Sequence, residues 1–263
     1  MLRLHRLILS AKLHFFLLNT KKRKKNRNFA SSFIFNSDNM KIFAVGMNYA
    51  QHNKEIKTTL LQQGVGTKDD DREREPVIFT KADSSLLKDG KPFFVPDFMG
   101  RIDYETEVVV RICKLGKSID EKFAHRYYDA VTLGIDFTAR DLQKRLREQG
   151  QPWEIAKGFD GAAVIGEWQP TPPLTEGKEA EITNSIQGLH FRMEMNGEVR
   201  QEGCTSDMLC SVDRLIAYIS KFFTLKTGDL LFTGTPVGVG EVKPNDHIVG
   251  YLEERKLLDF YCR

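Results

Sequence analysis

The chain has 263 residues, of which 41% are hydrophobic and 29% charged, so it is long enough to bury the core of one large globular domain. No apolar stretch approaches the roughly 20 residues that a membrane-spanning helix needs, so we expect no membrane partner. The net charge is +3, but residues 1–39 carry nine Lys and Arg against one acid, which leaves −5 for residues 40–263. A mildly acidic body of this kind predicts no nucleic-acid partner.

The basic leader, residues 1–39, admits several interpretations. A secretory signal has its positive charge before the apolar segment, whereas the main basic run here, residues 21–27, follows it. A transit peptide fits the lack of acids but not the lysine block, and a basic run can also bind nucleic acid or anionic lipid. We hypothesise that Met40 is the true start, because an apolar strand follows at once, and that residues 1–39 are disordered or not translated.

Four scattered cysteines, without a C-x-x-C pair, predict reduced structural thiols in a cytoplasmic protein.

The first half of the body predicts short strands joined by polar loops. In chain order we expect a strand at 41–45 ended by Gly46, helical turns at 48–56, a charged loop at 64–75, a strand at 76–79, and an Asp89-Gly90 hairpin turn between 84–88 and 91–95.

The second half contains the clearest strand, residues 104–112, which carries consecutive β-branched residues. Further strands are expected at 131–137, 161–166, 189–195, 229–233 and 247–252, with helices at 119–130, 139–148 and 211–223. The order is not a regular β-α alternation. It therefore predicts a β-rich α+β domain rather than a doubly wound parallel sheet.

Glu105 and Glu107 lie two residues apart on a predicted strand, so both carboxylates point to the same face. Two buried like charges need a positive partner, and a hard divalent cation fits an all-oxygen set better than a lysine. Asp136 ends another predicted strand and would complete the set. The alternative is an exposed strand edge without a ligand, and spacing alone does not remove it.

His52 and Glu55 are spaced to share one face of a short helix, where the carboxylate can orient the imidazole as a general base. A surface pair without function has the same spacing. Lys157 lies in an apolar setting before a predicted turn. Residues 233–240 form a Gly-rich loop after a strand, which lets backbone amides approach an anion but is not a P-loop.

Five segments in order resemble the fumarylacetoacetate hydrolase superfamily. They are VGMNYAQH (45–52), DYETEVVV (103–110), IDFTARDLQ (135–143), PWEIAKGFD (152–160) and GDLLFTGTPVGVG (228–240). One such motif would be weak evidence, whereas five in order across residues 40–263 are strong. The leader lies outside the resemblance.

The resemblance implies one catalytic domain at 40–263: an α+β, β-rich mixed sandwich roll with short flanking helices, usually a homodimer, with a mobile lid near 48–75. It implies a small-molecule 2-oxo acid as substrate and Mg²⁺ or Mn²⁺ near the mouth of the roll. The site residues that it implies are the metal ligands Glu105, Glu107 and Asp136, the polar Lys157 beside the metal, Arg140, Gln143 and Thr235 at the substrate, and a His52–Glu55 lid pair.

The lid pair resembles that of the acylpyruvase and oxaloacetate decarboxylase branch. This implies metal-dependent cleavage of a C–C bond, by acylpyruvate hydrolysis or oxaloacetate decarboxylation, with Lys157 stabilising developing negative charge. Met47, where that branch often has Arg, and Lys81-Ala82, where it often has Lys-Pro, weaken the assignment of the substrate. The alternatives are an isomerase or decarboxylase of 2-hydroxy-dienoate diacids and a non-catalytic ligand-binding protein on the same fold.

Overall fold

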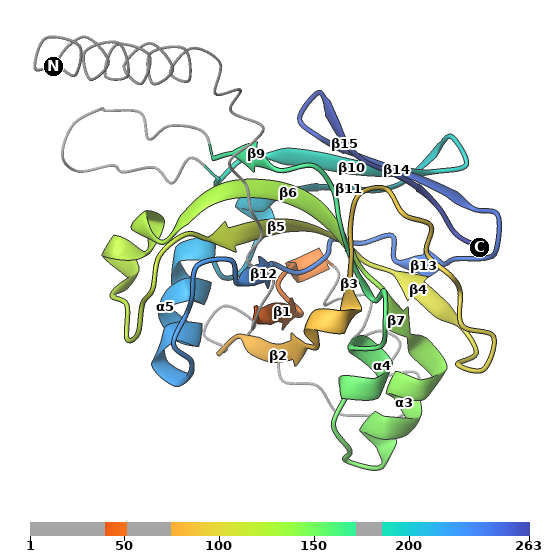
Figure 1. The fold of residues 1–263 in the computed structure, drawn as a ribbon, viewed down its shortest axis with the longest axis horizontal. Helices are drawn as coiled ribbons and strands as arrows, with labels where there is room; N and C mark the ends of the chain where they lie inside the picture. The colour runs from red at the N-terminus through yellow and green to blue at the C-terminus, as the bar shows by residue number, and fades with distance from the viewer. Residues whose placement is uncertain (1–39, 52–74, 172–185) are drawn as a thin grey trace, which may run out of the picture. The chain divides into compact units, whose positions relative to one another are not determined.

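The computed structural model describes residues 40–51, 75–171 and 186–263, which lie within one compact unit, Ser37–Arg263 (Figure 1). Its strands are β1 (Ile42–Gly46), β2 (Val77–Lys81), β3 (Leu86–Leu87), β4 (Ile102–Tyr104), β5 (Thr106–Ile112), β6 (Tyr128–Asp136), β7 (Thr138–Ala139), β8 (Ala163–Ile165), β9 (Gln169–Pro170), β10 (His190–Met195), β11 (Glu198–Cys204), β12 (Leu230–Phe232), β13 (Gly240–Glu241), β14 (His247–Leu252) and β15 (Arg255–Tyr261). The helices are α3 (Arg140–Glu148), α4 (Glu154–Lys157) and α5 (Val212–Phe222), with short 3-10 turns η2 (Asp83–Ser85), η3 (Glu121–Arg126) and η4 (Thr205–Asp207).

Three sheets form the frame of this unit. A large mixed sheet has the order β2-β1-β12-β5-β6-β8-β3, with β9 also paired to β6, and it contains parallel pairs at β1–β12 and β3–β8. A four-stranded antiparallel sheet, β11-β10-β14-β15, packs against β5 and β6 of the large sheet (Figure 1). The third sheet consists of β13, β4 and β7. The β-rich α+β class, with few short helices, is confirmed.

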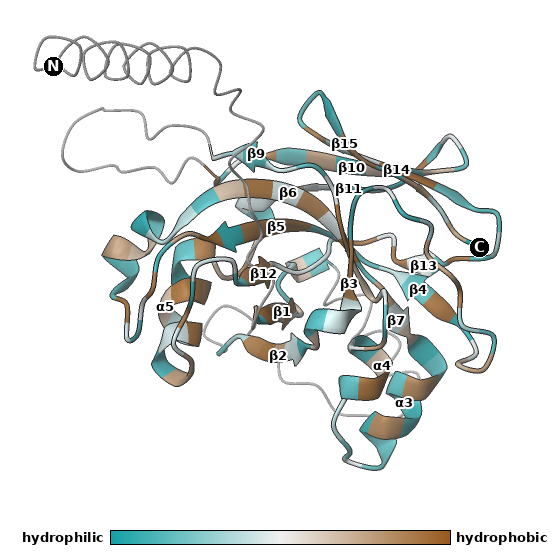
Figure 2. Cartoon of the chain, viewed as in Figure 1, coloured by the Kyte–Doolittle hydropathy of each residue, from teal (hydrophilic) through white to brown (hydrophobic). Residues whose placement is uncertain are grey.

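The central strands are buried on both faces, which explains their continuous apolar runs. Val108, Val109 and Val110 of β5 are all inaccessible to solvent, because the four-stranded sheet lies on one side of the large sheet and α5 on the other (Figures 1 and 2). β14, by contrast, alternates between buried and partly exposed residues, as expected of a strand with one face towards the core.

α5 illustrates how local sequence fixes an element. The Ser211 side chain accepts a hydrogen bond from the backbone N–H of Arg214 and so caps the helix. Leu215 and Ile219, one turn apart, are buried in the core. The predicted helix at 211–223 is therefore confirmed.

The predicted helix at 119–130 was wrong. Asp120 caps a 3-10 turn, η3, but the turn ends at Arg126 and β6 begins at Tyr128. Strand pairing overrides the helical preference of these residues, because Tyr128 and Ala130 pair with Ile112 and Arg111 of β5.

The predicted hairpin around Asp89-Gly90 was wrong in its strands and right in its turn. Asp89 and Gly90 both have positive φ, 65° and 63°, as the tight turn requires. The flanking segments do not pair with each other: β3 pairs in parallel with β8, and Phe93 bridges to Cys262.

Asn48 and Tyr49 are buried, although they belong to the predicted lid at 48–75. The Asn48 side chain donates to the carbonyls of Cys210 and Thr233 and accepts from the Cys210 N–H. Residues 52–74, most of the predicted lid, lie outside the described residues, as does the leader, so both stay predictions.

Within the described residues, no helix has the length and apolar character needed to cross a membrane. All four cysteines have free thiols. The homodimer and the cytoplasmic location stay predictions.

Candidate functional site

The predicted strand 104–112 is interrupted at Glu105, where the chain passes from one sheet to another. β4, before it, pairs with β7 and β13, whereas β5, after it, runs through the large sheet. Asp136 ends β6, and its N–H donates to the Glu105 carbonyl at 2.8 Å. Both glutamates and Asp136 are thereby brought to one point.

The three carboxylates form a buried cluster. Glu105, Glu107 and Asp136 are 7%, 1% and 1% exposed, and one oxygen of each lies within 4.8 Å of the others. Burial of this degree contradicts the exposed-edge alternative, since unpaired charges on a solvated face would remain accessible.

Lys157 joins two of these carboxylates. Its Nζ, on α4, donates to Glu105 Oε2 at 2.7 Å, to Asp136 Oδ2 at 3.0 Å and to Thr138 Oγ1 at 2.7 Å. Burial by itself would lower the pKa of Lys157, but the carboxylates of Asp136 and Glu105 outweigh it and raise the pKa. Lys157 is therefore a buried cation with its charge held by the cluster.

Lys81 is a second buried cation that sequence reasoning did not assign to the site. Its Nζ lies 2.5 Å from Asp136 Oδ1 and also donates to the carbonyls of Lys157 and Ala162. Burial lowers the pKa of Lys81, and the Asp136 charge opposes that effect. Its position was a usable signal, because Lys81 ends the strand VIFTK and is the one charged residue in it.

Arg140 and Gln143 lie beside the cluster, on the first turn of α3. Arg140 donates to Glu105 Oε1 at 2.6 Å, to Asp103 Oδ2 at 2.8 Å and to the Gln143 side chain at 2.9 Å. Asp103, which is 2% exposed, also accepts a hydrogen bond from Arg101. Asp103 therefore holds the Arg140 guanidinium in place. Sequence reasoning missed Asp103, although it lies within the matched segment 103–110.

Glu107 differs from its neighbours in its partners. Its Oε2 accepts the Gly234 N–H at 2.6 Å, but no Lys or Arg of the described residues forms an ion pair with it. Burial, followed by the charges of Asp136 and Glu105, raises the pKa of Glu107 well above its usual range. Among the described residues, Glu107 is thus the one carboxylate of the three without an ion pair to a Lys or Arg, although Lys157 acts on it electrostatically.

The donor set fits a divalent metal ion. Three carboxylates converge in an all-oxygen arrangement, which hard cations such as Mg²⁺ and Mn²⁺ prefer. A dipositive ion would also give Glu107 the direct ion pair that no Lys or Arg of the described residues forms with it. The cluster could therefore hold one metal ion, with Glu105, Glu107 and Asp136 as its protein ligands.

The Gly-rich loop reaches the same place from β12. Gly234 adopts φ 96°, and a Cβ there would lie 2.8 Å from the Asn48 Cβ, so glycine allows the close approach that delivers its N–H to Glu107. Thr235 follows and is 4% exposed. His52 and Glu55 lie outside the described residues, so their place relative to the cluster stays a prediction.

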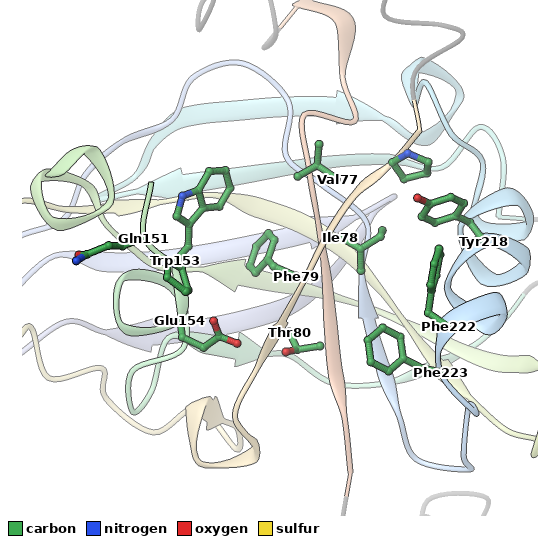
Figure 3. A pocket seen from close by; sticks show the side chains of 12 residues that line it. Val77, Ile78, Phe79, Thr80, Gln151, Trp153, Glu154, Tyr218, Phe222 and Phe223 are labelled. Carbon is green, nitrogen blue, oxygen red and sulfur yellow. The ribbon is translucent and has the colours of Figure 1, made fainter. Parts of the chain in front are cut away.

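A separate groove of about 660 Å³ runs along the edge strand β2 (Figure 3). Phe79 faces Trp153 on one side of the strand, and Ile78 faces Phe222 and Phe223 on the other. The Phe79 ring centroid lies 5.3 Å from Lys157 Nζ, so this ring adjoins the cluster. The three carboxylates do not line the groove.

Comparison with known proteins gives consistent matches over most of the chain. Residues 41–256 match the model of the fumarylacetoacetate (FAA) hydrolase C-terminal family. The mitochondrial oxaloacetate tautomerase FAHD1 of Mus musculus is 36% identical over 207 residues, 79% of this chain and 84% of that protein. Oxaloacetate tautomerase YcgM of Escherichia coli is 35% identical over 208 residues, 79% and 86% of the two chains.

Among solved structures, fumarylpyruvate hydrolase from Pseudomonas aeruginosa, in complex with Mn²⁺ and pyruvate, aligns with a TM-score of 0.71 and 31% identity, and covers 84% of this chain and 88% of that one. The resemblance seen in the five sequence segments is thus confirmed by the family match, the relatives and the fold. The chain belongs to the fumarylacetoacetate hydrolase family and is an enzyme of that family.

Proposed function

We propose that the protein uses Mg²⁺, or Mn²⁺, to act on a small 2-oxo acid through an enolate, with oxaloacetate as its substrate. Decarboxylation of oxaloacetate and keto–enol exchange both develop negative charge on the 2-oxo oxygen, and acylpyruvate cleavage does the same. When bound, the metal ion supplies a Lewis acid that polarises this oxygen. The observation that carries the proposal is the buried trio of carboxylates, in which Glu107 lacks a cationic partner among the described residues.

The charge balance of the site favours an anionic substrate. Counted as ionised, four carboxylates (Asp103, Glu105, Glu107 and Asp136) face four cations (Lys81, Arg101, Arg140 and Lys157). A divalent ion adds two positive charges to this balance, so metal binding favours the binding of an anionic 2-oxo acid.

The chain's own residues then have separate roles. Lys157 remains protonated because Asp136 and Glu105 raise its pKa, so it stabilises developing negative charge through its own charge rather than acting as a base, while its three N–H groups donate to Glu105, Asp136 and Thr138. Arg140 is aligned by Asp103 and carries a fixed positive charge beside the cluster. Thr235 and Gln143 complete the proposed contacts with the substrate.

Oxaloacetate is favoured as the substrate because two relatives at 35–36% identity are named oxaloacetate tautomerases. Decarboxylation needs the metal and the donors but no base. Proton exchange needs a group that accepts a proton, and the described residues place no histidine at the cluster. We assign that role to the predicted His52–Glu55 pair.

The test is an activity panel with oxaloacetate, acetylpyruvate and a 2-hydroxy-dienoate diacid, each with Mg²⁺, with Mn²⁺ and after chelation. We expect oxaloacetate to be turned over with either ion and turnover to stop when the metal is removed. Preferred turnover of the dienoate would instead support the isomerase alternative. A wild type inactive on all three substrates would support a ligand-binding protein.

A second candidate function, acylpyruvate hydrolysis, is favoured by the structural match to fumarylpyruvate hydrolase. It requires an activated water, so it depends on the same lid pair. His52→Ala should lower hydrolysis and enol–keto exchange by about 10²–10⁴-fold, as loss of a general base does, and leave metal binding and decarboxylation unchanged. Equal losses in all three reactions, with weaker metal binding, would contradict this division of roles.

A further inference from the structure

The Gly-rich loop between β12 and β13 lies against the second sheet. Gly238, at φ 94°, approaches β11 so closely that a Cβ would lie 2.4 Å from the Arg200 carbonyl. A Cβ at Gly203 would lie 3.0 Å from the Pro236 side chain. The loop thus packs on β11, and its conformation depends on that strand.

Gln201 of β11 is the polar side chain at this contact. It is 1% exposed, and its Oε1 accepts the N–H of Thr106, the residue between Glu105 and Glu107, at 2.9 Å. Its Nε2 points to the loop, at 2.9 Å from Thr235 Oγ1, 3.1 Å from the Pro236 carbonyl and 3.3 Å from the Val237 carbonyl. One amide therefore joins the ligand-bearing strand to the loop.

The partners fix which way this amide is turned. The backbone N–H of Thr106 can only donate, so the oxygen of Gln201 must face it. The two loop carbonyls can only accept, so the Gln201 NH₂ must face them. Exchanging the two groups would place the oxygen against two carbonyls and the NH₂ against an N–H.

This orientation determines the polarity of the Thr235 hydroxyl. Because Oγ1 accepts from the Gln201 NH₂, the hydroxyl proton points elsewhere. Thr235 donates no hydrogen bond to any of the described residues. With respect to the described residues, its proton is therefore available to an incoming acceptor.

We infer that Gln201 is a positioning residue that makes Thr235 a hydrogen-bond donor to a carboxylate of the substrate. The inference rests on the proposed function for the substrate class, since an anionic oxygen is the acceptor that such a donor suits. Gln201 acts through Thr235 and does not itself touch the substrate. The same amide keeps Thr235 in register with Glu105 and Glu107, through Thr106.

Gln201→Glu tests the polarity directly. An ionised glutamate still accepts from Thr106 but cannot donate to Thr235, so the hydroxyl donates to the new carboxylate and turns away from the ligand. We expect calorimetric titration with oxalate, in saturating Mg²⁺, to show at least about tenfold weaker binding. Thr235→Val should give a similar loss, and Gln201→Met, which adds no charge, should give part of it.

The double variant separates positioning from simple charge repulsion or misfolding. In the Thr235→Val background, Gln201→Glu should cause no further loss of oxalate affinity, because the hydroxyl through which it acts is gone. Mg²⁺ affinity should stay within about threefold of wild type throughout, and Glu202→Gln, on the exposed face of the same strand, should change nothing. Additive losses, or loss of Mg²⁺ binding in Gln201→Met, would overturn the inference.

The two proposals fail separately. A wild type that turns over no 2-oxo acid, but whose oxalate binding depends on Gln201 only through Thr235, would overturn the proposed function and keep this inference. Active wild type with additive Gln201 and Thr235 effects would overturn the inference and keep the function.

Discussion

Glu107→Gln is expected to reduce metal-dependent turnover at least about a hundredfold and to remove high-affinity metal binding. The substitution is nearly isosteric, and the amide oxygen can still accept from the Gly234 N–H. What it removes is the negative charge of the carboxylate that forms no ion pair with a Lys or Arg of the described residues. The measurement is oxaloacetate turnover against Mg²⁺ concentration, compared with Glu202→Gln as a surface control.

The same substitution should stabilise the metal-free protein, in contrast to its effect on activity. Burial and the neighbouring carboxylates raise the pKa of Glu107, so the folded protein retains a proton that the unfolded chain releases above about pH 4.5. Wild type therefore loses stability as pH rises from that point until the raised pKa is passed. Glu107→Gln lacks this loss, because it has no proton to release.

Thermal unfolding in chelator measures this difference. The midpoint of Glu107→Gln minus that of wild type should grow as pH rises above about 4.5 and then level off. Adding Mg²⁺ should raise the wild-type midpoint and leave that of the variant unchanged. A variant less stable than wild type at every pH, or one still stabilised by Mg²⁺, would show that Glu107 is a structural residue.

Lys81→Met is expected to have the second large effect. Lys81 is buried and paired with Asp136 at 2.5 Å, and its loss leaves that carboxylate with Lys157 as its remaining cation among the described residues. Breaking a buried ion pair on one side costs about 3–5 kcal/mol, so the metal-free protein should unfold at clearly lower denaturant concentration. Turnover should fall at least about a hundredfold, because Asp136 also belongs to the metal site.

Lys91→Met is the matched control, because it removes a lysine from an exposed position on the loop that follows β3. It should leave both stability and turnover unchanged. If Lys81→Met kept wild-type turnover, the ion pair with Asp136 would have no part in the site.

The sequence predicted the carboxylate trio but not the way the fold assembles it. The spacing predicted that Glu105 and Glu107 lie on one continuous strand. In the structure the chain passes from one sheet to another at Glu105, and Asp136, at the end of β6, lies beside it. The alternation of side chains along one strand does not indicate where the chain passes from one sheet to another, because that point depends on the strands with which each segment pairs. The order of the five motifs, rather than the spacing of the glutamates, was what identified Asp136 as a ligand in the predicted metal site.

The cations around the trio show a second limit. Lys157 was singled out from its apolar surroundings, but Lys81 and Asp103 were not, although Lys81 ends a strand that is otherwise uncharged. Their roles depend on contacts between residues 55 and 37 positions apart, Lys81 with Asp136 and Asp103 with Arg140, which local patterns do not encode. These pairs of opposite charge are recognised from the three-dimensional arrangement of the strands and helices that carry them.

β11 was missed for a different reason. The Asn196-Gly197 turn, with φ of 57° and 82°, is a strong hairpin signal between β10 and β11, but Glu198–Cys204 is mostly exposed and polar and shows no clear alternation. Gln201, the residue that joins this strand to the site, is its one buried member. A hairpin turn after a predicted strand therefore indicates a second strand even where the segment that follows is polar.

Titration of the metal-free protein with Mn²⁺, followed by electron paramagnetic resonance, tests the central claim most directly. We predict one tightly bound ion per chain in wild type, displaced by Mg²⁺ in competition, and none in Glu107→Gln. Wild type that binds no ion, or Glu107→Gln that binds one as tightly as wild type, would contradict the assignment of Glu105, Glu107 and Asp136 as a metal site.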